Sequence, residues 1–281
     1  MLDVLSMVWW PAVLAGLVAI GVTLSIERWG GTIGGLLGTL PTTIVPASLG
    51  LASQSRQPQD FEAAMYIVPA GMLLNALFLW LWRVLPPRLQ KGSLVLRLAQ
   101  MSIVSLALWL LAAVGLVWLT RSFRASGTSV FWTGALALLL SVVVGVWACW
   151  DRPPSPRGSK QIGPLIHLAR GLLAGVAVGA AVWLSSTGNS LLAGVASVFP
   201  AIFLTTMIAL WLSQHRAVQV GAVGPMMLGS SSVSMYAMLA PSAAQITGSL
   251  WGFLLAWLGA VVLTTLPAWW WLSKRGEAQE D

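Results

Sequence analysis

Charged residues are scarce in this sequence. Only 8% of its 281 residues are Asp, Glu, Lys or Arg, whereas an ordinary soluble domain carries roughly 25%. Apolar residues make up 57% of the chain, and the mean hydropathy is +0.83. This composition rules out a soluble globular enzyme and indicates a membrane protein.

Cysteine and histidine are nearly absent. Cys149 is the only cysteine and lies inside an apolar run, so neither a disulfide framework nor a thiolate metal cluster can be built from it. His167 and His215 have no Cys, Asp or Glu close to them in the sequence. We therefore expect no metal site and no cofactor.

Acidic residues are absent from the interior of every apolar run. All eight fall at a run end, in a loop or in a tail: Asp3, Glu27, Asp60, Glu62, Asp151, Glu277, Glu280 and Asp281. Intramembrane ionisable residues mark proton relays and cation sites, so a proton antiporter with a midplane carboxylate and a divalent-metal transporter are not expected. The runs also lack a nucleophile with a base, paired aspartates or a histidine set, and we predict that the chain is not an enzyme.

Nine apolar runs follow one another along the chain. They cover about residues 7–26, 30–52, 63–82, 99–120, 130–150, 167–186, 189–213, 219–240 and 246–272. Each is close to the roughly 20 residues that cross a bilayer as a helix. The predicted fold class is an all-α integral membrane protein with nine transmembrane helices. Because the N-terminus lacks the positive leader of a secretory signal peptide, the first run is expected to remain as a span.

Basic residues divide unevenly between the two sides that nine spans define. Arg56, Arg121 and Arg124 lie on the side of the N-terminus. The other twelve lie on the opposite side: Arg28, Arg83, Arg88, Lys91, Arg97, Arg152, Arg157, Lys160, Arg170, Arg216, Lys274 and Arg275. Basic residues favour the cytoplasmic side, so we predict a multi-pass protein of the inner (plasma) membrane with its N-terminus outside and its C-terminus cytoplasmic. The basic residues form no single patch, so the lipid bilayer and not a nucleic acid is the expected partner.

The second and seventh runs match when they are aligned on their internal prolines. GGLLGTLPTTIVPASLGL contains Pro41, and AGVASVFPAIFLTTMIAL contains Pro200. Two four-span units separated by one unpaired span enter the membrane from opposite sides, which makes an inverted-topology repeat. Chance similarity between Gly-rich apolar segments is the alternative. The predicted units are a first four-span repeat (1–125), a linker helix with a cytoplasmic loop (126–164), a second four-span repeat (165–273) and a polar cytoplasmic tail (274–281).

The same stretches resemble a known family. SLLAGVASVFPAIFLTTMIAL, and more loosely GGTIGGLLGTLPTTIVPASLGL, is similar to the GlpM-like bacterial inner-membrane proteins, which have four spans and carry a Gly followed by a Pro in the second. The resemblance covers about residues 10–120 and again 168–272. It implies a fused, double-length version of such a protein and implies nothing about a substrate.

Prolines and hydroxyl groups inside the runs predict a binding site near the membrane midplane. Proline removes a backbone donor, and interrupted helices expose backbone groups to a substrate. The candidate substrate-binding residues are Gly38, Pro41, Thr42, Thr43, Asn75, Ser197, Pro200, Ser230, Ser231 and Ser234. Close helix packing is the alternative for the small residues, and interhelical hydrogen bonding is an equal alternative for Asn75.

Glycines at four-residue spacing in the sixth run indicate helix contacts. No polar residue lies between Gly171, Gly175 and Gly179 in LARGLLAGVAVGAAVW, and glycine lets two helix backbones approach closely. We expect these residues to be structural. A homo-oligomer formed through Gly-rich faces is left open.

Two functions are consistent with these features. The first is a secondary transporter or facilitator of a small neutral or amphipathic solute, which would bind between the two four-span units. The second is a non-transporting membrane scaffold or accessory subunit. A polar cavity at Pro41, Pro200 and the serine cluster would favour transport, and a bundle filled with side chains would favour a scaffold.

Overall fold

The computed structural model describes residues 2–29, 40–86, 93–150, 163–213 and 216–277. Every regular element in these ranges is a helix. In chain order they are α1 (Leu2–Trp29), α3 (Ile44–Gln54), α4 (Pro58–Tyr66), α5 (Val68–Val84), α6 (Leu94–Ala125), α7 (Val130–Ala148), α8 (Pro164–Ser186), α9 (Ser190–Ser197), α10 (Ala201–Ser213), α11 (Arg216–Gly229), α12 (Ser231–Thr247), α13 (Ser249–Ala260), the π-helix η2 (Val261–Thr265) and α14 (Leu266–Glu277).

Six helical segments of the described chain are long and apolar enough to cross a membrane. They are Pro58–Val84, Leu94–Ala125, Val130–Ala148, Pro164–Ser186, Ser190–Leu212 and Leu250–Arg275. These segments coincide with the third to seventh and the ninth predicted runs. Helix α1 adds the shorter apolar stretch Val8–Gly21, and the eighth run is divided between α11 and α12. The prediction of a helical protein with several helices of membrane-spanning length is confirmed.

Several predicted runs are divided into two half-helices. Pro69 is in the first turn of α5, and only Ile67 separates α5 from α4. Pro200 directly precedes α10, and α9 ends at Ser197. Because proline has no N–H and clashes with the carbonyl four residues before it, a helix ends or bends there. Helices α11 and α12 are divided at Ser230.

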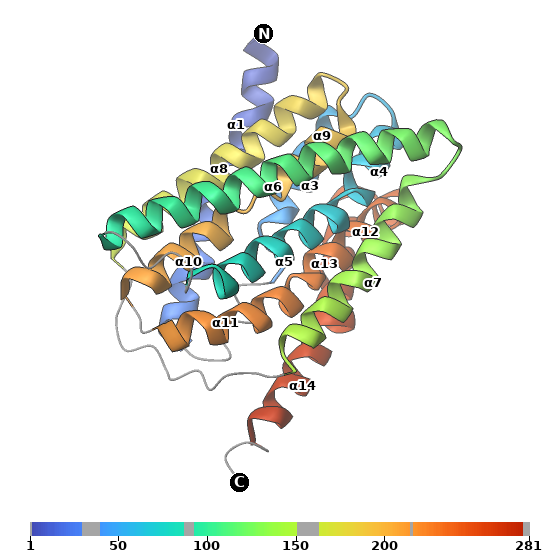
Figure 1. The fold of residues 1–281 in the computed structure, drawn as a ribbon. Coiled ribbons are helices and arrows are strands. Elements are labelled where there is room, and N and C mark those ends of the chain that lie inside the picture. Colours follow the sequence, from blue (N-terminus) through green and yellow to red (C-terminus); the bar gives the residue numbers. More distant parts are fainter. Residues whose placement is uncertain (1, 30–39, 87–92, 151–162, 214–215, 278–281) are drawn as a thin grey trace.

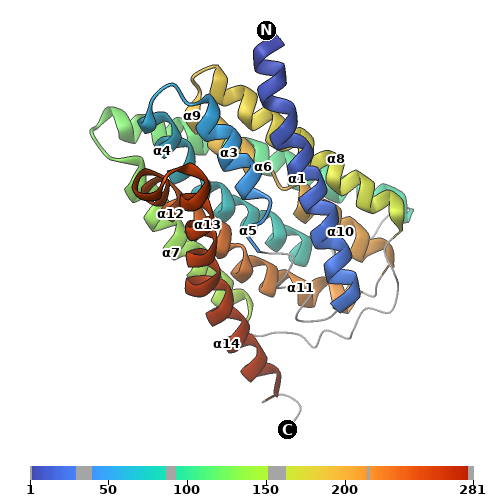
Figure 2. The same ribbon diagram turned by 180° about the vertical axis from the view of Figure 1, so that it is seen from behind.

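Helices α1 and α8 cross and pack closely against each other through their middle parts (Figures 1 and 2). Their glycines set the closeness of this contact. A Cβ on Gly16 would lie 2.9 Å from the carbonyl oxygen of Gly171, and a Cβ on Gly175 would lie 2.9 Å from that of Ala12. Residue numbers at the contact rise along α1 while they fall along α8, so the two helices are antiparallel. The predicted glycine face of α8 therefore packs against α1 of the same chain.

Apolar side chains cover the outer faces of the long helices. Leu111 on α6 is 70% exposed, Trp132 on α7 is 66% exposed and Leu172 on α8 is 65% exposed. The largest fully buried side chains lie instead on central helices, among them Trp82 of α5 and Tyr236 of α12. A bundle with apolar side chains both inside and outside suits a lipid surrounding, because hydrocarbon does not penalise the exposed apolar faces.

Hydrogen bonds group the helix ends into two ends of the molecule. At one end they join Arg56 to Ser186, Arg121 to Asn189 and Gln245 to Glu62. At the other end they join Arg83 to Ala148 and Arg275 to Trp150. The start of α1 and the end of α14 lie at opposite ends of the bundle (Figure 1).

Candidate functional site

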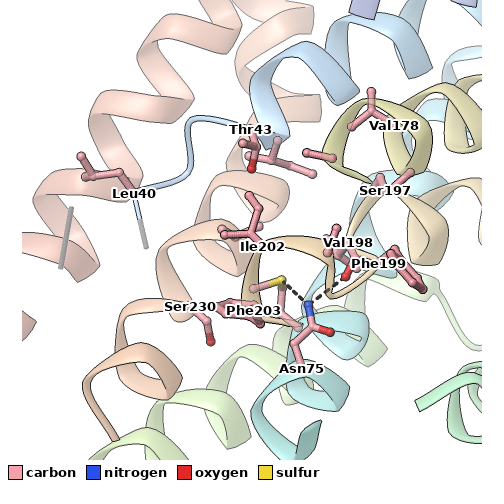
Figure 3. A pocket seen from close by; sticks show the side chains of 16 residues that line it. Leu40, Thr43, Asn75, Val178, Ser197, Val198, Phe199, Ile202, Phe203 and Ser230 are labelled. Carbon is pink, nitrogen blue, oxygen red and sulfur yellow. Dashed lines mark hydrogen bonds between the residues drawn. The ribbon is translucent and has the colours of Figure 1, made fainter. Parts of the chain in front are cut away.

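A cavity lies where the divided helices meet. Its volume is about 70 Å³, which is room for several water molecules or a small organic solute. Its wall comes from the start of α3, the middle of α5 and α8, the break between α9 and α10, and the start of α12 (Figure 3). The lining residues are Leu40, Thr43, Ile44, Met72, Asn75, Ala174, Ala177, Val178, Ser197, Val198, Phe199, Ala201, Ile202, Phe203, Ser230 and Val233.

The wall of this cavity is mostly apolar, with a few polar groups. Hydroxyls come from Thr43, Ser197 and Ser230, and an amide comes from Asn75. None of the lining residues within the described part of the chain is charged. A mostly apolar pocket with a small number of placed polar groups is typical of small-molecule sites.

Asn75 satisfies the backbone at the break between α9 and α10. Its amide nitrogen donates to the carbonyl oxygen of Val198 at 2.8 Å, as Figure 3 shows, and its amide oxygen accepts from Trp109 Nε1 at 2.7 Å. Asn75 is only 1% exposed. A carbonyl left without its helical partner is costly in an apolar surrounding, so this side chain stabilises the break and ties α5, α6 and the α9–α10 junction together.

The serine cluster at the start of α12 is almost entirely buried. Ser230 donates to the carbonyl oxygen of Met227 at 2.7 Å, and Ser231 donates to that of Leu228 at 2.7 Å. Ser234 is fully buried, and its hydroxyl has no hydrogen-bond partner among the described residues. The two bonds back to the preceding turn are the kind that hydroxyls form inside apolar helices.

The cavity brings together four of the candidate residues: Thr43, Asn75, Ser197 and Ser230. Pro41 and Thr42 lie in the turn before α3, and Pro200 lies between the lining residues Phe199 and Ala201. Ser231 and Ser234 are on α12 but do not line the cavity. Gly38 lies outside the described residues.

Two buried polar interactions were not anticipated from the sequence. Arg170 of α8 is 3% exposed, and its guanidinium donates to Thr205 at 3.2 Å and to Thr206 at 2.7 Å. The hydroxyls of Ser48 and Tyr236 lie 2.5 Å apart and join α3 to α12. Arg170 is the fourth residue of the predicted run 167–186, and a charged residue within that run was the available signal. Nothing in the sequence pairs Ser48 with Tyr236.

Comparison of the chain with protein-family models, with curated proteins and with solved structures gives no match. The resemblance to the GlpM-like proteins therefore stays a prediction.

Proposed function

We propose that this chain is a nine-span membrane protein built from two inverted four-span repeats around the linker helix α7. The loop contacts support this count. In a nine-span chain, six of the hydrogen-bonded residues lie on the same side of the membrane: Arg56, Glu62, Arg121, Ser186, Asn189 and Gln245. They bond to one another in three pairs, so no bond joins residues from opposite sides. Arg83 bonds to Ala148 and Arg275 bonds to Trp150, and all four residues lie on the opposite side.

The positions of the helix breaks support the inverted repeat. In the proposed second repeat α9 and α10 are divided before Pro200, and in the first repeat α3 starts shortly after Pro41. The next span is divided in both repeats, at Ile67 and at Ser230. The proposed first spans of the two units, α1 and α8, are antiparallel neighbours, as an inverted repeat requires.

The proposed orientation places the C-terminus in the cytoplasm and the N-terminus outside an inner (plasma) membrane. The twelve basic residues assigned to the side of the C-terminus, against three on the other side, support it, because cytoplasmic loops carry an excess of Lys and Arg.

The proposed activity is transport or facilitated passage of a small neutral or amphipathic solute. One observation carries it: the cavity lies between the two proposed repeats, with Thr43 before α3 from one and Ser197 and Ser230, at the breaks α9–α10 and α11–α12, from the other. Transporters built from inverted repeats bind their solutes at such junctions. A helix bundle that served only as a scaffold would need neither the divided helices nor the cavity between them.

The test is solute flux through the purified protein in liposomes. Osmotic swelling and shrinkage would be followed by light scattering with urea, glycerol and erythritol as uncharged probes. Ala177 lines the cavity, whereas its neighbour Val176 is 61% exposed on the outer face. We expect Ala177→Leu to fill the cavity and reduce the flux at least several-fold, and Val176→Leu to leave it unchanged. Flux no faster than in protein-free liposomes would reject transport and favour the scaffold.

A further inference from the structure

Two columns of large side chains lie between the cavity and the end of the bundle at which α5 and α10 finish. The first column is on α5, where Asn75 lines the cavity and Phe78 and Trp82 follow on the same helix face, because residues three, four and seven apart share one face. Phe78 is 1% exposed and Trp82 is 0% exposed. The indole N–H of Trp82 donates to Ser105 Oγ of α6 at 3.2 Å, which holds the ring in place.

The second column is on α10. Phe203 lines the cavity, and Met207 and Trp211 follow it at four-residue steps, which is the spacing of one helix face. Met207 is fully buried, whereas Trp211 is partly exposed. The two columns meet where the rings of Trp82 and Trp211 pack edge-on, with their centroids 5.8 Å apart. This ring contact closes the bundle about two turns beyond the cavity.

The two proposed repeats meet in different ways on the two sides of the cavity. On this side, Trp82 of the first repeat and Trp211 of the second meet through side-chain rings. On the other side, α9 packs against α4 at backbone distance, since a Cβ on Gly194 would overlap the carbonyl oxygen of Ala64. Side chains move apart when one helix tilts, whereas backbones in contact leave no side chain to displace. The ring contact is therefore the easier of the two to open.

The break before α10 supplies a hinge. Helix α9 ends at Ser197, and α10 begins at Ala201, directly after Pro200. Hinges are commonly a few residues at the ends of helices, which absorb the change in backbone angles. At 1.5 Å per residue, Trp211 lies roughly 15 Å along α10 from Ala201. A small tilt of α10 about the break therefore moves Trp211 further than it moves the residues that line the cavity.

We propose that the ring contact between Trp82 and Trp211 is a gate, and that tilting of α10 about the α9–α10 break opens the cavity there. This inference rests on the proposed transport function and adds the route by which a solute passes between the cavity and the end of the bundle at which α10 finishes. Trp82 is the fixed half of the gate, because it is fully buried and bonded to Ser105. Trp211 is the moving half.

A cysteine in the cavity wall tests the gate. Ala177 lines the cavity, so Ala177→Cys places a thiol there, and the natural Cys149, 1% exposed in a separate cluster, stays as an internal reference. Methyl methanethiosulfonate, a small uncharged thiol reagent, would be added to the purified protein, and mass spectrometry of its peptides would give the modification rate at each cysteine. We expect Trp211→Ala to raise the rate at position 177 by on the order of two- to tenfold, which is what the loss of one aromatic pair allows. The rate at Cys149 should stay the same.

Two control variants separate the gate from a general loosening of the bundle. Trp251→Ala removes the same side chain from α13, where Trp251 is 69% exposed, and should leave the rate at position 177 unchanged. Trp211→Phe keeps a ring against Trp82 and should also leave it unchanged. An unchanged rate in Trp211→Ala would overturn the proposal, and so would an equal increase at Cys149 or in Trp251→Ala. If Trp211→Ala is not monodisperse, Trp211→Leu, which also removes the ring, is measured by the same criteria.

The gate and the transport function fail in different ways. Glycerol and urea flux that Ala177→Leu blocks, together with an unchanged modification rate in Trp211→Ala, would retain transport and reject the gate. Faster modification in Trp211→Ala without any flux would retain a cavity closed by Trp211 and reject transport.

Discussion

Asn75 illustrates how one side chain makes a helix break tolerable inside an apolar bundle. The break before Pro200 leaves the Val198 carbonyl oxygen without a helical partner, and the Asn75 amide supplies one at 2.8 Å. Trp109 occupies the other end of the amide at 2.7 Å and packs edge-on against Phe199, with ring centroids 5.5 Å apart. The residue therefore has a structural role even though it also lines the cavity.

We expect Asn75→Leu to lower the free energy of unfolding by about 1–3 kcal/mol. The substitution leaves the Val198 carbonyl and the Trp109 N–H buried without partners, and such groups cost more than the bond itself contributes. Thermal unfolding in detergent measures the loss. The double variant Asn75→Leu with Trp109→Phe should lose less than the sum of the single variants, because the unpaired N–H is then absent.

Asn189→Leu is the matched control for this prediction. Asn189 binds Arg121 at the exposed end of the bundle, where water replaces a lost partner, so we expect a change within about 0.5 kcal/mol. Strict additivity in the Asn75 and Trp109 pair would show that the two side chains do not act through their shared hydrogen bond.

The sequence singles out Asn75 as a buried polar residue, but it predicts neither the hydrogen-bond partners of Asn75 nor the burial of Arg170. Asn75 stands out because it is an amide deep in an apolar run, and a buried amide needs partners. Its partners Val198 and Trp109 are distant in the sequence, and only the packing of α5 against α6 and the α9–α10 junction brings them to it. Arg170 was assigned to the basic side of the membrane by its charge. Its burial depends on the hydroxyls of Thr205 and Thr206 on another helix.

At the scale of helices, hydrophobic runs predicted where helices occur better than where they divide. The described parts of all nine runs are mostly helical, because a chain in lipid satisfies its backbone groups within a helix. Proline explains the divisions at Ile67 and before Pro200. It does not predict the division at Ser230, because Pro225 lies inside α11 and the helix continues to Gly229.

The glycines of α8 give an element-scale prediction. The four-residue spacing predicts the same close helix contact for Gly175 and Gly179, but in the structure only Gly175 lies close to the backbone of α1. A Cβ on Gly175 would lie 2.9 Å from the backbone oxygen of Ala12, whereas a Cβ on Gly179 would lie 3.4 Å from the nearest side-chain atom. We expect Gly175→Ala to force α1 and α8 apart and to cost about 1–3 kcal/mol. Thermal unfolding of the purified variant measures this.

Gly179→Ala provides the control on the same helix. Its new methyl group fits at ordinary contact distance, and alanine favours the helix over glycine by up to about 1 kcal/mol. We therefore expect unchanged or slightly increased stability. Equal destabilisation by both substitutions would contradict the close approach at Gly175 as the distinguishing feature of this contact.

At the scale of the whole molecule, the basic residues and the loop contacts are independent indications of topology. The charge distribution depends only on the sequence and on the number of spans. The hydrogen bonds at the two ends depend on how the helices pack. They join residues that are far apart in the sequence, such as Arg121 with Asn189 and Arg83 with Ala148. One span missing or added between Arg56 and Arg275 would place the two members of at least one of these pairs on opposite sides. Their agreement is the reason to propose nine spans.

Cysteine accessibility in intact cells tests this topology directly. The natural Cys149 is 1% exposed, so a membrane-impermeant maleimide should label it little. Cysteines would be introduced singly at three exposed positions, Ser126, Thr187 and Ser93. Nine spans with the N-terminus outside predict that Ser126→Cys and Thr187→Cys react in intact cells, and that Ser93→Cys reacts only after the cells are made permeable. Labelling of Ser126→Cys and Thr187→Cys from different sides would contradict the span count, because it requires an odd number of crossings between them. If all three positions showed the reverse accessibility, the span count would remain and the orientation inferred from the basic residues would be wrong.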